Sequence, residues 1–260
     1  MKRKAIIVSL KGTNLSRMEK ILFSKEKPWG VILFKRNLKS LNQIKKLTFK
    51  IRSLTKDKKF PIIIDEEGEK VSRLRDILNH EISANFFGRL YKKDKNFCTK
   101  FYSQYINSLT DILNKLGINI NTIPVLDVLR NNTNKVIGTR SFSKDKHIIN
   151  QLGKLTIKHL HQNRIAAVVK HIPGHGAATV DSHKKMPKVN LDLEKLNKID
   201  FYPFKFSKAK FAMTAHVLYS KIDKKNVATL SKKIIEDVIR KKIGFKGILI
   251  SDDISMKALR

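Results

Sequence analysis

Short apolar runs alternate with longer amphipathic segments along this chain. The runs that have the length and continuity of buried strands cover residues 5–10, 30–34, 60–64, 118–128, 165–169, 211–219 and 247–250. Segments between them place apolar residues at helical spacing, as in residues 41–51, 101–116 and 230–240. Ser231 precedes the last of these helices and suits an N-cap. Strands that alternate with helices predict parallel β/α units.

The number of strands favours a barrel. Seven strands in succession and a length of 260 residues suit a single α/β domain of the TIM type over residues 1–260. A closed (β/α)8 barrel needs eight strands, but only ten residues follow the seventh run. We therefore predict a (β/α)8 barrel that lacks its last β/α unit and is incomplete at its C-terminus. A truncated gene product, an incomplete sequence record or an open barrel closed by a partner would each explain this length.

Charge is the strongest compositional feature. The formal net charge is +33, with 55 basic and 22 acidic residues, which first indicates a nucleic-acid partner. Only 12 of the basic residues are arginine, however, and the lysines are spread along the whole sequence. Specific readers of nucleic acid rely on arginine for bidentate base contacts. We therefore interpret the charge mainly as a lysine-rich solvated surface and do not expect a nucleic-acid partner.

Two further classes are disfavoured. Cys98 is the single cysteine, which excludes an intramolecular disulfide framework. The apolar run at residues 5–10 is shorter than the core of a signal peptide, and no run approaches the roughly 18 apolar residues of a membrane span. The expected location is the cytoplasm, and no membrane partner is expected.

Ionisable residues follow several of the predicted strands. In β/α barrels the chemistry gathers at the carboxyl ends of the strands. Polar residues stand at five such positions: Asp65-Glu66-Glu67, Asp127, Lys170-His171, His216 and Ser251-Asp252-Asp253. Any one of them alone would be interpreted as a cap or a satisfied loop residue. Their recurrence predicts a polar pocket at one rim of the barrel.

Residues 170–183 are the richest segment in candidate chemistry. Gly174 and Gly176 flank His175 and indicate a flexible loop, and Asp181 is close enough to His183 to orient its imidazole. A carboxylate such as Asp252, facing this loop from another strand, suits a two-step displacement in which one group attacks and the other protonates the leaving oxygen. A metal site is the less favoured alternative, with the donors His171, His175, Asp181, His183 and His216.

With these residues assembled, the chain resembles glycoside hydrolase family 3, in its β-N-acetylhexosaminidase (NagZ-like) branch. The segments that carry the resemblance are Ile64-Asp-Glu-Glu-Gly68 with Arg73, Pro124-Val-Leu-Asp-Val128, Ile137-Gly-Thr-Arg-Ser-Phe142, residues 170–183, Ala215-His-Val-Leu-Tyr219 and Ile250-Ser-Asp-Asp-Ile-Ser-Met256. They occur in the family's order and cover nearly the whole chain.

The resemblance implies a role for each matching residue. Asp252 would be the nucleophile, and His183 would be the acid/base with Asp181 as its partner. The substrate-binding residues would be Asp65, Arg73, Arg140, Lys170 and His171. The implied reaction is retaining hydrolysis that releases terminal N-acetylglucosamine from muropeptides during peptidoglycan recycling, without a metal or cofactor. Asp253 would be structural.

Departures from the family pattern leave alternatives open. Glu69 and Lys70 stand where the family usually has Gly and Arg, which puts the geometry of that loop in doubt. A family 3 β-glycosidase or phosphorylase of other sugar preference is a second hypothesis. A catalytically inactive remnant or a basic binding protein is a third, motivated by the charge and the absent eighth strand.

Overall fold

The computed structural model describes residues 3–79, 81–180 and 186–259. Its strands are β1 (Lys4–Ser9), β2 (Pro28–Leu33), β3 (Ile62–Ile64), β4 (Ile120–Asn121), β5 (Ala166–Ile172), β6 (Lys188–Val189), β7 (Phe211–Thr214), β8 (Leu218–Tyr219) and β9 (Ile248–Ser251). The seven-stranded sheet has the order β1-β2-β3-β4-β5-β7-β9, and each neighbouring pair is parallel. This sheet confirms the prediction of an α/β fold with seven parallel strands.

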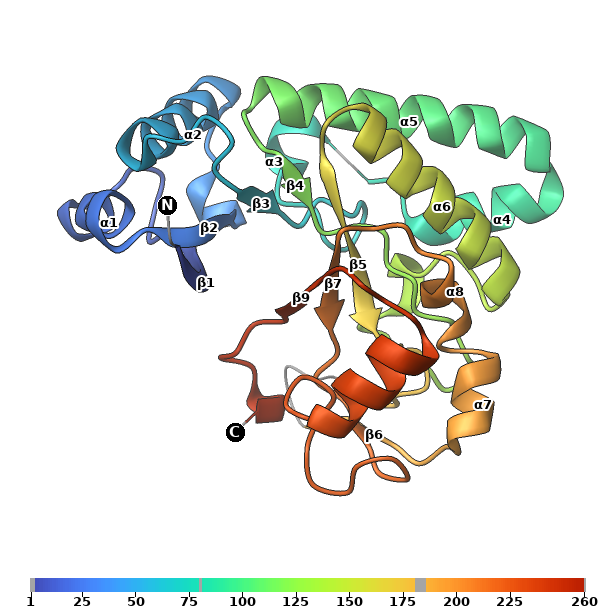
Figure 1. The fold of residues 1–260 in the computed structure, drawn as a ribbon. Helices are drawn as coiled ribbons and strands as arrows, with labels where there is room; N and C mark the ends of the chain where they lie inside the picture. The colour runs from blue at the N-terminus through green and yellow to red at the C-terminus, as the bar shows by residue number, and fades with distance from the viewer. Residues whose placement is uncertain (1–2, 80, 181–185, 260) are drawn as a thin grey trace.

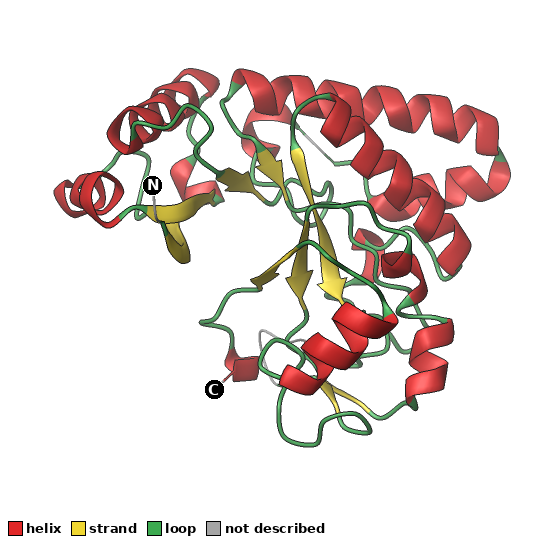
Figure 2. Cartoon of the chain, viewed as in Figure 1, coloured by secondary structure: helices red, strands yellow, loops and turns green. Residues whose placement is uncertain are grey.

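The sheet curls into a half-barrel (Figure 1). Within the described residues β1 and β9 stand at the two ends of the sheet order, so these strands do not close a barrel. The strands lie at the centre, and the helices are arranged around the outside of the curl (Figure 2). This arrangement matches a TIM-like barrel domain in part, and a full (β/α)8 barrel is not formed by the described residues.

Helical segments connect the strands. They are α1 (Arg17–Ile21), η1 (Leu22–Glu26), η2 (Lys35–Asn37), α2 (Leu41–Thr55), α3 (Arg75–Leu78), α4 (Ala84–Lys93), α5 (Lys95–Lys115), η3 (Gly138–Arg140), α6 (Lys146–Gln162), α7 (Leu193–Lys198), α8 (Tyr202–Lys205), η4 (Ile234–Lys242) and η5 (Lys257–Leu259). The three helices predicted from apolar spacing correspond to α2, α5 and η4, which confirms them as helical. The hydroxyl of Ser231 accepts a hydrogen bond from the N–H of Ile234 at 3.1 Å, which is the predicted N-cap contact.

Alternation along the strands divides the buried side chains between two sides of the sheet. Ile62 and Ile64 of β3 belong to the main core, which the helices cover, whereas Ile63 packs with a separate cluster. That cluster also contains Ile120, Val168 and Met213 from three other strands. The alternation of side chains along each strand therefore produces an outer core against the helices and a smaller core inside the curl.

Two of the apolar runs extend well beyond the strands that they predicted. The run at residues 118–128 forms only the two-residue β4, and the chain touches β5 again just after Pro124, where Val125 forms an isolated parallel bridge with Lys170. The run at residues 211–219 divides into β7 and β8, and β8 pairs with β6 in a separate two-stranded sheet. The N–H of Ala215 donates to the carbonyl of Ile172 at 2.8 Å, so the pairing of β7 with β5 extends to the residue after β7.

Gly88 allows α4 to press against the segment that carries Arg140. A Cβ atom at position 88 would lie 1.7 Å from the carbonyl oxygen of Phe142, which is backbone and cannot move aside alone. We expect Gly88→Ala to lower the free energy of unfolding by about 1–3 kcal/mol, as overpacking does. Gly12→Ala is the matched control, because nothing lies within 4 Å of a Cβ there. Urea unfolding of both variants tests this, and equal stabilities would contradict the packing argument.

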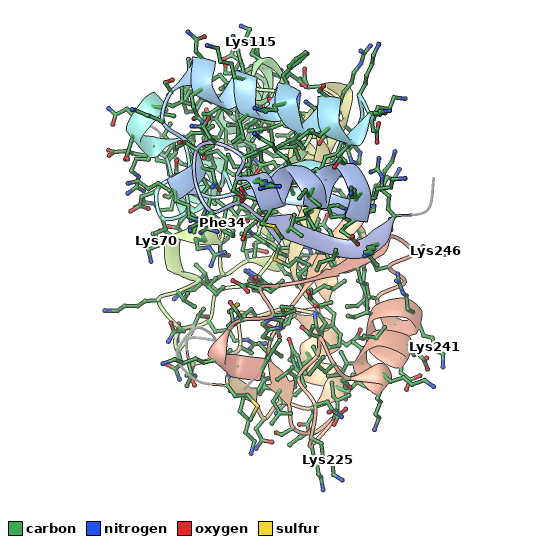
Figure 3. All side chains as sticks on the ribbon, turned by 90° about the vertical axis from the view of Figure 1, so that its left-hand side faces the viewer. Phe34, Lys70, Lys115, Lys225, Lys241 and Lys246 are labelled. Atoms are coloured by element: carbon green, nitrogen blue, oxygen red, sulfur yellow. The ribbon has the colours of Figure 1, made fainter. Side chains whose placement is uncertain are left out.

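The lysine-rich surface is dispersed over the molecule. Figure 3 shows Lys115 at the top of the view, Lys70 at the left, Lys225 at the bottom, and Lys241 and Lys246 at the right. In the part of the chain that the structure describes, no helix is long and apolar enough to cross a membrane.

Candidate active site

Strand register brings most of the predicted site residues to one rim. Asp65 directly follows β3, and Lys170 and His171 lie in the last three residues of β5. Ile172 of β5 pairs with Thr214 of β7, which pairs with Ser251 of β9. Asp252 therefore follows its strand at the same end of the sheet. The carboxyl ends of parallel strands meet at one edge, as the sequence pattern predicted.

The centre of the site is a buried group of charges, called here the carboxylate–lysine cluster and made of Asp65, Glu67, Arg73, Arg140 and Lys170. Lys170 is 2% exposed, and its Nζ lies 2.5 Å from Oε1 of Glu67 and 3.4 Å from Oδ1 of Asp65. Nη2 of Arg73 donates to Oδ2 of Asp65 at 2.9 Å. The cluster therefore confines three cations and two carboxylates in a small volume.

Thr122 and Arg140 complete the contacts of this cluster. The Thr122 hydroxyl donates to Asp65 and accepts from Nζ of Lys170 at 2.8 Å. Arg140 donates to both oxygens of Glu67, from Nε at 2.7 Å and from Nη2 at 2.9 Å. This bidentate pair is largely buried, with side-chain exposures of 11% and 5%, so Arg140 is not in a surface ion pair.

The ionised state of both carboxylates is maintained by the cations. Burial by itself raises the pKa of Asp65, but the charges of Lys170 and Arg73 outweigh it and hold this pKa well below its usual range. Burial likewise raises the pKa of Glu67, and Arg140 and Lys170 overcome it and lower the pKa to about 2. Glu67 in turn raises the pKa of Arg140 against the opposing effect of burial. The acceptors in the cluster are therefore charged at neutral pH.

Acid is expected to destabilise the fold through Glu67 and Asp65. Their pKa values are lower in the folded chain than in the unfolded chain, so their contribution is present above about pH 4.5. It is lost as the pH falls toward the folded pKa of Glu67, which is about 2. Urea unfolding between these limits should show stability falling with pH, and Glu67→Gln should flatten the slope. The exposed Glu194→Gln is the control, and an unchanged slope in Glu67→Gln would contradict this assignment.

The loop after β3 is shaped by Glu66 and Gly68. The buried Glu66 carboxylate accepts hydrogen bonds from the Ser72 hydroxyl at 2.6 Å and from the N–H of Arg73 and Leu74 at 2.8 and 2.9 Å. It thereby orients the segment that carries Arg73. Gly68 has a φ of +132°, a conformation that favours glycine, whereas Glu69 has no positive φ. The side chain at Glu69 is therefore accommodated without backbone strain.

A second buried group lies beside the carboxylate–lysine cluster. Asp127 is fully buried and contacts Nδ1 of His171 at 2.7 Å. Nε2 of the same ring lies 3.5 Å from Nη2 of Arg140, which links the two groups. His175 packs edge-on against His171. Burial is the main cause that lowers the pKa of His175 to about 4, and the proximity of His171 adds to this effect.

The segment around Asp252 is held by local contacts. Oδ1 of Asp252 accepts from the N–H of Asp253 at 2.8 Å, and the Asp253 carboxylate accepts from the N–H and hydroxyl of Ser255. Nε2 of the buried His216 lies 3.1 Å from the carbonyl of Asp253, and its Nδ1 lies 2.7 Å from the hydroxyl of Thr229. His216 therefore attaches the end of β9 to the segment after β7.

The structure brings together some of the predicted residues and leaves others untested. Asp65, Arg73, Arg140, Lys170 and His171 form one contact network. Asp252 lies at the same rim by strand register. Asp181 and His183, the predicted acid/base pair, lie outside the described residues. The roles implied for all of these residues remain predictions.

Several residues of the site had no role in the sequence prediction. Glu67 and Asp127 stood among the polar residues after strands, and their positions were the available signal. No signal in the sequence indicated Thr122, because it is a small hydroxyl residue inside an apolar run. Within residues 3–79, 81–180 and 186–259, no group of three or more His, Cys, Asp or Glu side chains is arranged to hold a metal ion. Two donors of the metal alternative, Asp181 and His183, are not among those residues.

Comparison with known proteins places this chain among the glycoside hydrolases. Residues 5–260 match the N-terminal domain of glycosyl hydrolase family 3. The chain belongs to this family, as the sequence motifs indicated.

Relatives of known name agree with this assignment. A β-hexosaminidase A of Pseudoalteromonas piscicida is 32% identical, and the match covers 88% of this chain and 41% of that protein. A β-hexosaminidase of Nitrosomonas eutropha is 31% identical, with 98% of this chain and 73% of the relative covered. The chain thus spans less than half of the first relative and about three quarters of the second.

A solved structure shares the fold closely. Native NagZ from Neisseria gonorrhoeae superposes with a TM-score of 0.91 at 30% identity, covering 98% of this chain and 74% of that one. The same protein has also been solved in complex with N-trifluoroacetyl-D-glucosamine, again with a TM-score of 0.91. These matches concern the half-barrel as described above.

Proposed function

We propose that this chain is a retaining exo-β-N-acetylglucosaminidase that releases terminal N-acetylglucosamine from peptidoglycan fragments. The observation that carries the proposal is the convergence of Asp65, Arg73, Arg140, Lys170 and His171 at the rim where β9 delivers Asp252. Charged acceptors beside fixed donors suit the hydroxyl and acetamido groups of a sugar. The similarity to β-hexosaminidases supports the choice of sugar.

The proposed mechanism has two steps. The carboxylate of Asp252 attacks the anomeric carbon while the imidazolium of His183 protonates the departing glycosidic oxygen, which breaks the bond and forms a glycosyl-enzyme. Water then attacks the same carbon as His183 takes its proton, and Asp252 leaves as a carboxylate. Asp181 is proposed to orient and stabilise the imidazolium. The carboxylate–lysine cluster holds the sugar. Neither step of the proposed reaction requires a metal or a cofactor.

A direct assay tests the proposal. The chain should release 4-nitrophenol from 4-nitrophenyl N-acetyl-β-D-glucosaminide and N-acetylglucosamine from an anhydromuropeptide. The 4-nitrophenyl β-glucoside is the control for sugar preference. Parallel reactions with and without inorganic phosphate separate hydrolysis from phosphorolysis, because only phosphorolysis yields a sugar 1-phosphate. Preference for the glucoside, a phosphate requirement or the absence of turnover would each reject the proposal.

A further inference from the structure

Asp127 is a buried carboxylate to which the proposed reaction assigns no step. It is 0% exposed, and each of its oxygens faces hydrogen-bond donors on the segment from His171 to His175. Oδ2 lies 2.7 Å from Nδ1 of His171. Oδ1 accepts from the backbone N–H of His175 at 2.6 Å and of His171 at 3.3 Å. Asp127 therefore contacts both the ring and the backbone of His171.

The chemistry of these contacts determines where the ring proton lies. Burial raises the pKa of Asp127, but the contacts with His171 and His175 together outweigh burial and lower the pKa, so the group is a carboxylate. A carboxylate only accepts hydrogen bonds, so Nδ1 of His171 must carry a proton. On the other side of the ring, Nε2 faces Nη2 of Arg140, and a guanidinium only donates. This arrangement favours a bare lone pair on Nε2.

We propose that Asp127 is a positioning residue that keeps the proton of His171 on Nδ1 and makes Nε2 an acceptor for a sugar hydroxyl. The identity of the sugar rests on the proposed function, whereas the position of the proton does not. Arg140 Nη2 and His171 Nε2 then form a donor and an acceptor 3.5 Å apart. One hydroxyl group that replaces this direct contact can accept from the first and donate to the second.

This pairing has a consequence for specificity. A hydroxyl that bonds to this site in both directions contributes two hydrogen bonds, and an analogue that lacks the hydroxyl forfeits both. Deoxy or fluoro analogues at the contacted carbon would lose the bond to Nε2, because neither hydrogen nor fluorine can donate a proton. Asp127 would thus influence substrate choice without touching the substrate.

Asp127→Asn separates the two contacts of this residue. The amide has the same shape, and its oxygen can still accept from the N–H groups of His175 and His171. Its NH₂ group would then face Nδ1 of His171 and donate to it, which requires that Nδ1 lose its proton to Nε2. The variant should therefore keep the backbone contacts and reverse the tautomer.

Nitrogen NMR reads the tautomer without substrate. In the wild-type protein at neutral pH, we expect the His171 ring, assigned with His171→Ala, to be protonated on Nδ1 and bare on Nε2. Asp127→Asn should show the reverse. Asp200→Asn is the matched control, because Asp200 is also fully buried but contacts Arg130, and the His171 tautomer should not change there. A wild-type ring protonated on Nε2 alone would overturn the proposal even if Asp127→Asn failed to fold.

Kinetics provide the second readout. Asp127→Asn should lower kcat/KM by roughly tenfold or more, mainly through KM, because the bond to Nε2 exists in the bound substrate. In a His171→Ala background the same substitution should have no further effect. If the two substitutions each lowered kcat/KM by an independent factor, Asp127 would act on something other than His171. Absence of activity in the wild-type protein would reject the proposed function and leave the NMR result standing.

Discussion

Asp252→Asn should reduce turnover of 4-nitrophenyl N-acetyl-β-D-glucosaminide on the order of 10⁴-fold, which is the scale measured when a group of the reacting set is removed. The amide cannot form the glycosyl-enzyme, because it lacks the anionic oxygen that attacks the anomeric carbon. Its oxygen can still accept the hydrogen bond that Asp252 takes from the N–H of Asp253 at 2.8 Å. The fold should therefore survive, and the melting temperature should stay close to that of the wild type.

Asp253→Asn is the matched control for this variant. Its Oδ1 accepts hydrogen bonds from the N–H and hydroxyl of Ser255, and the amide oxygen of asparagine can keep both. We expect a loss below about tenfold, as for a residue that supports geometry without reacting. A fluorinated substrate with a good leaving group should add one glycosyl unit to the wild type and to Asp253→Asn, detected by mass spectrometry, but not to Asp252→Asn. Substantial turnover by Asp252→Asn, or its labelling at another residue, would remove Asp252 from the nucleophile role.

Lys170→Met should destabilise the protein by about 3–5 kcal/mol, which is the cost of breaking a buried ion pair on one side. The methionine fills a similar volume but leaves the carboxylates of Asp65 and Glu67 without their shared cation. Lys188→Met, at an exposed position of β6, is the matched control and should change stability by no more than about 0.5 kcal/mol. Urea unfolding at neutral pH measures the difference.

A second substitution keeps this prediction testable if Lys170→Met does not fold. The Lys170–Glu67 contact is already lost in Lys170→Met, so adding Glu67→Gln costs less than it does in the wild type, and the double variant should be more stable than additivity predicts. Activity should remain low in both, because the proposed sugar-binding cluster has lost a donor. Similar stabilities for Lys170→Met and Lys188→Met would show that Lys170 does not hold the carboxylates together.

The strand pattern was the most predictable part of the fold. Each of the seven apolar runs overlaps one strand of the parallel sheet, because strands buried on both faces, such as β3, are apolar throughout. Strand ends were less predictable. The runs at residues 118–128 and 211–219 continue past β4 and β7, since apolar residues also line the buried segments that follow the strands. A buried segment and a hydrogen-bonded strand both appear as apolar runs in the sequence.

The sequence predicted the rim at which the site residues lie, but not which of them contact one another. Asp65, Lys170, His171 and Asp252 could be placed at the ends of strands, because parallel strands deliver their carboxyl ends to one edge. Glu67 had no predicted partner, although it takes hydrogen bonds from Arg140, 73 residues away along the chain. Thr122 was missed, since only the register of β3 and β4 brings it to Asp65.

The amino-acid sequence by itself determined the class of fold, the family and the rim at which the charged residues gather, because these depend on periodicity and on motifs within short stretches. Only the tertiary structure decided which carboxylate faces which cation, that Arg140 is buried against Glu67, and that Asp127 holds His171. Those pairings join residues from different β/α units. They depend on how the sheet curls, and no local pattern encodes the curl.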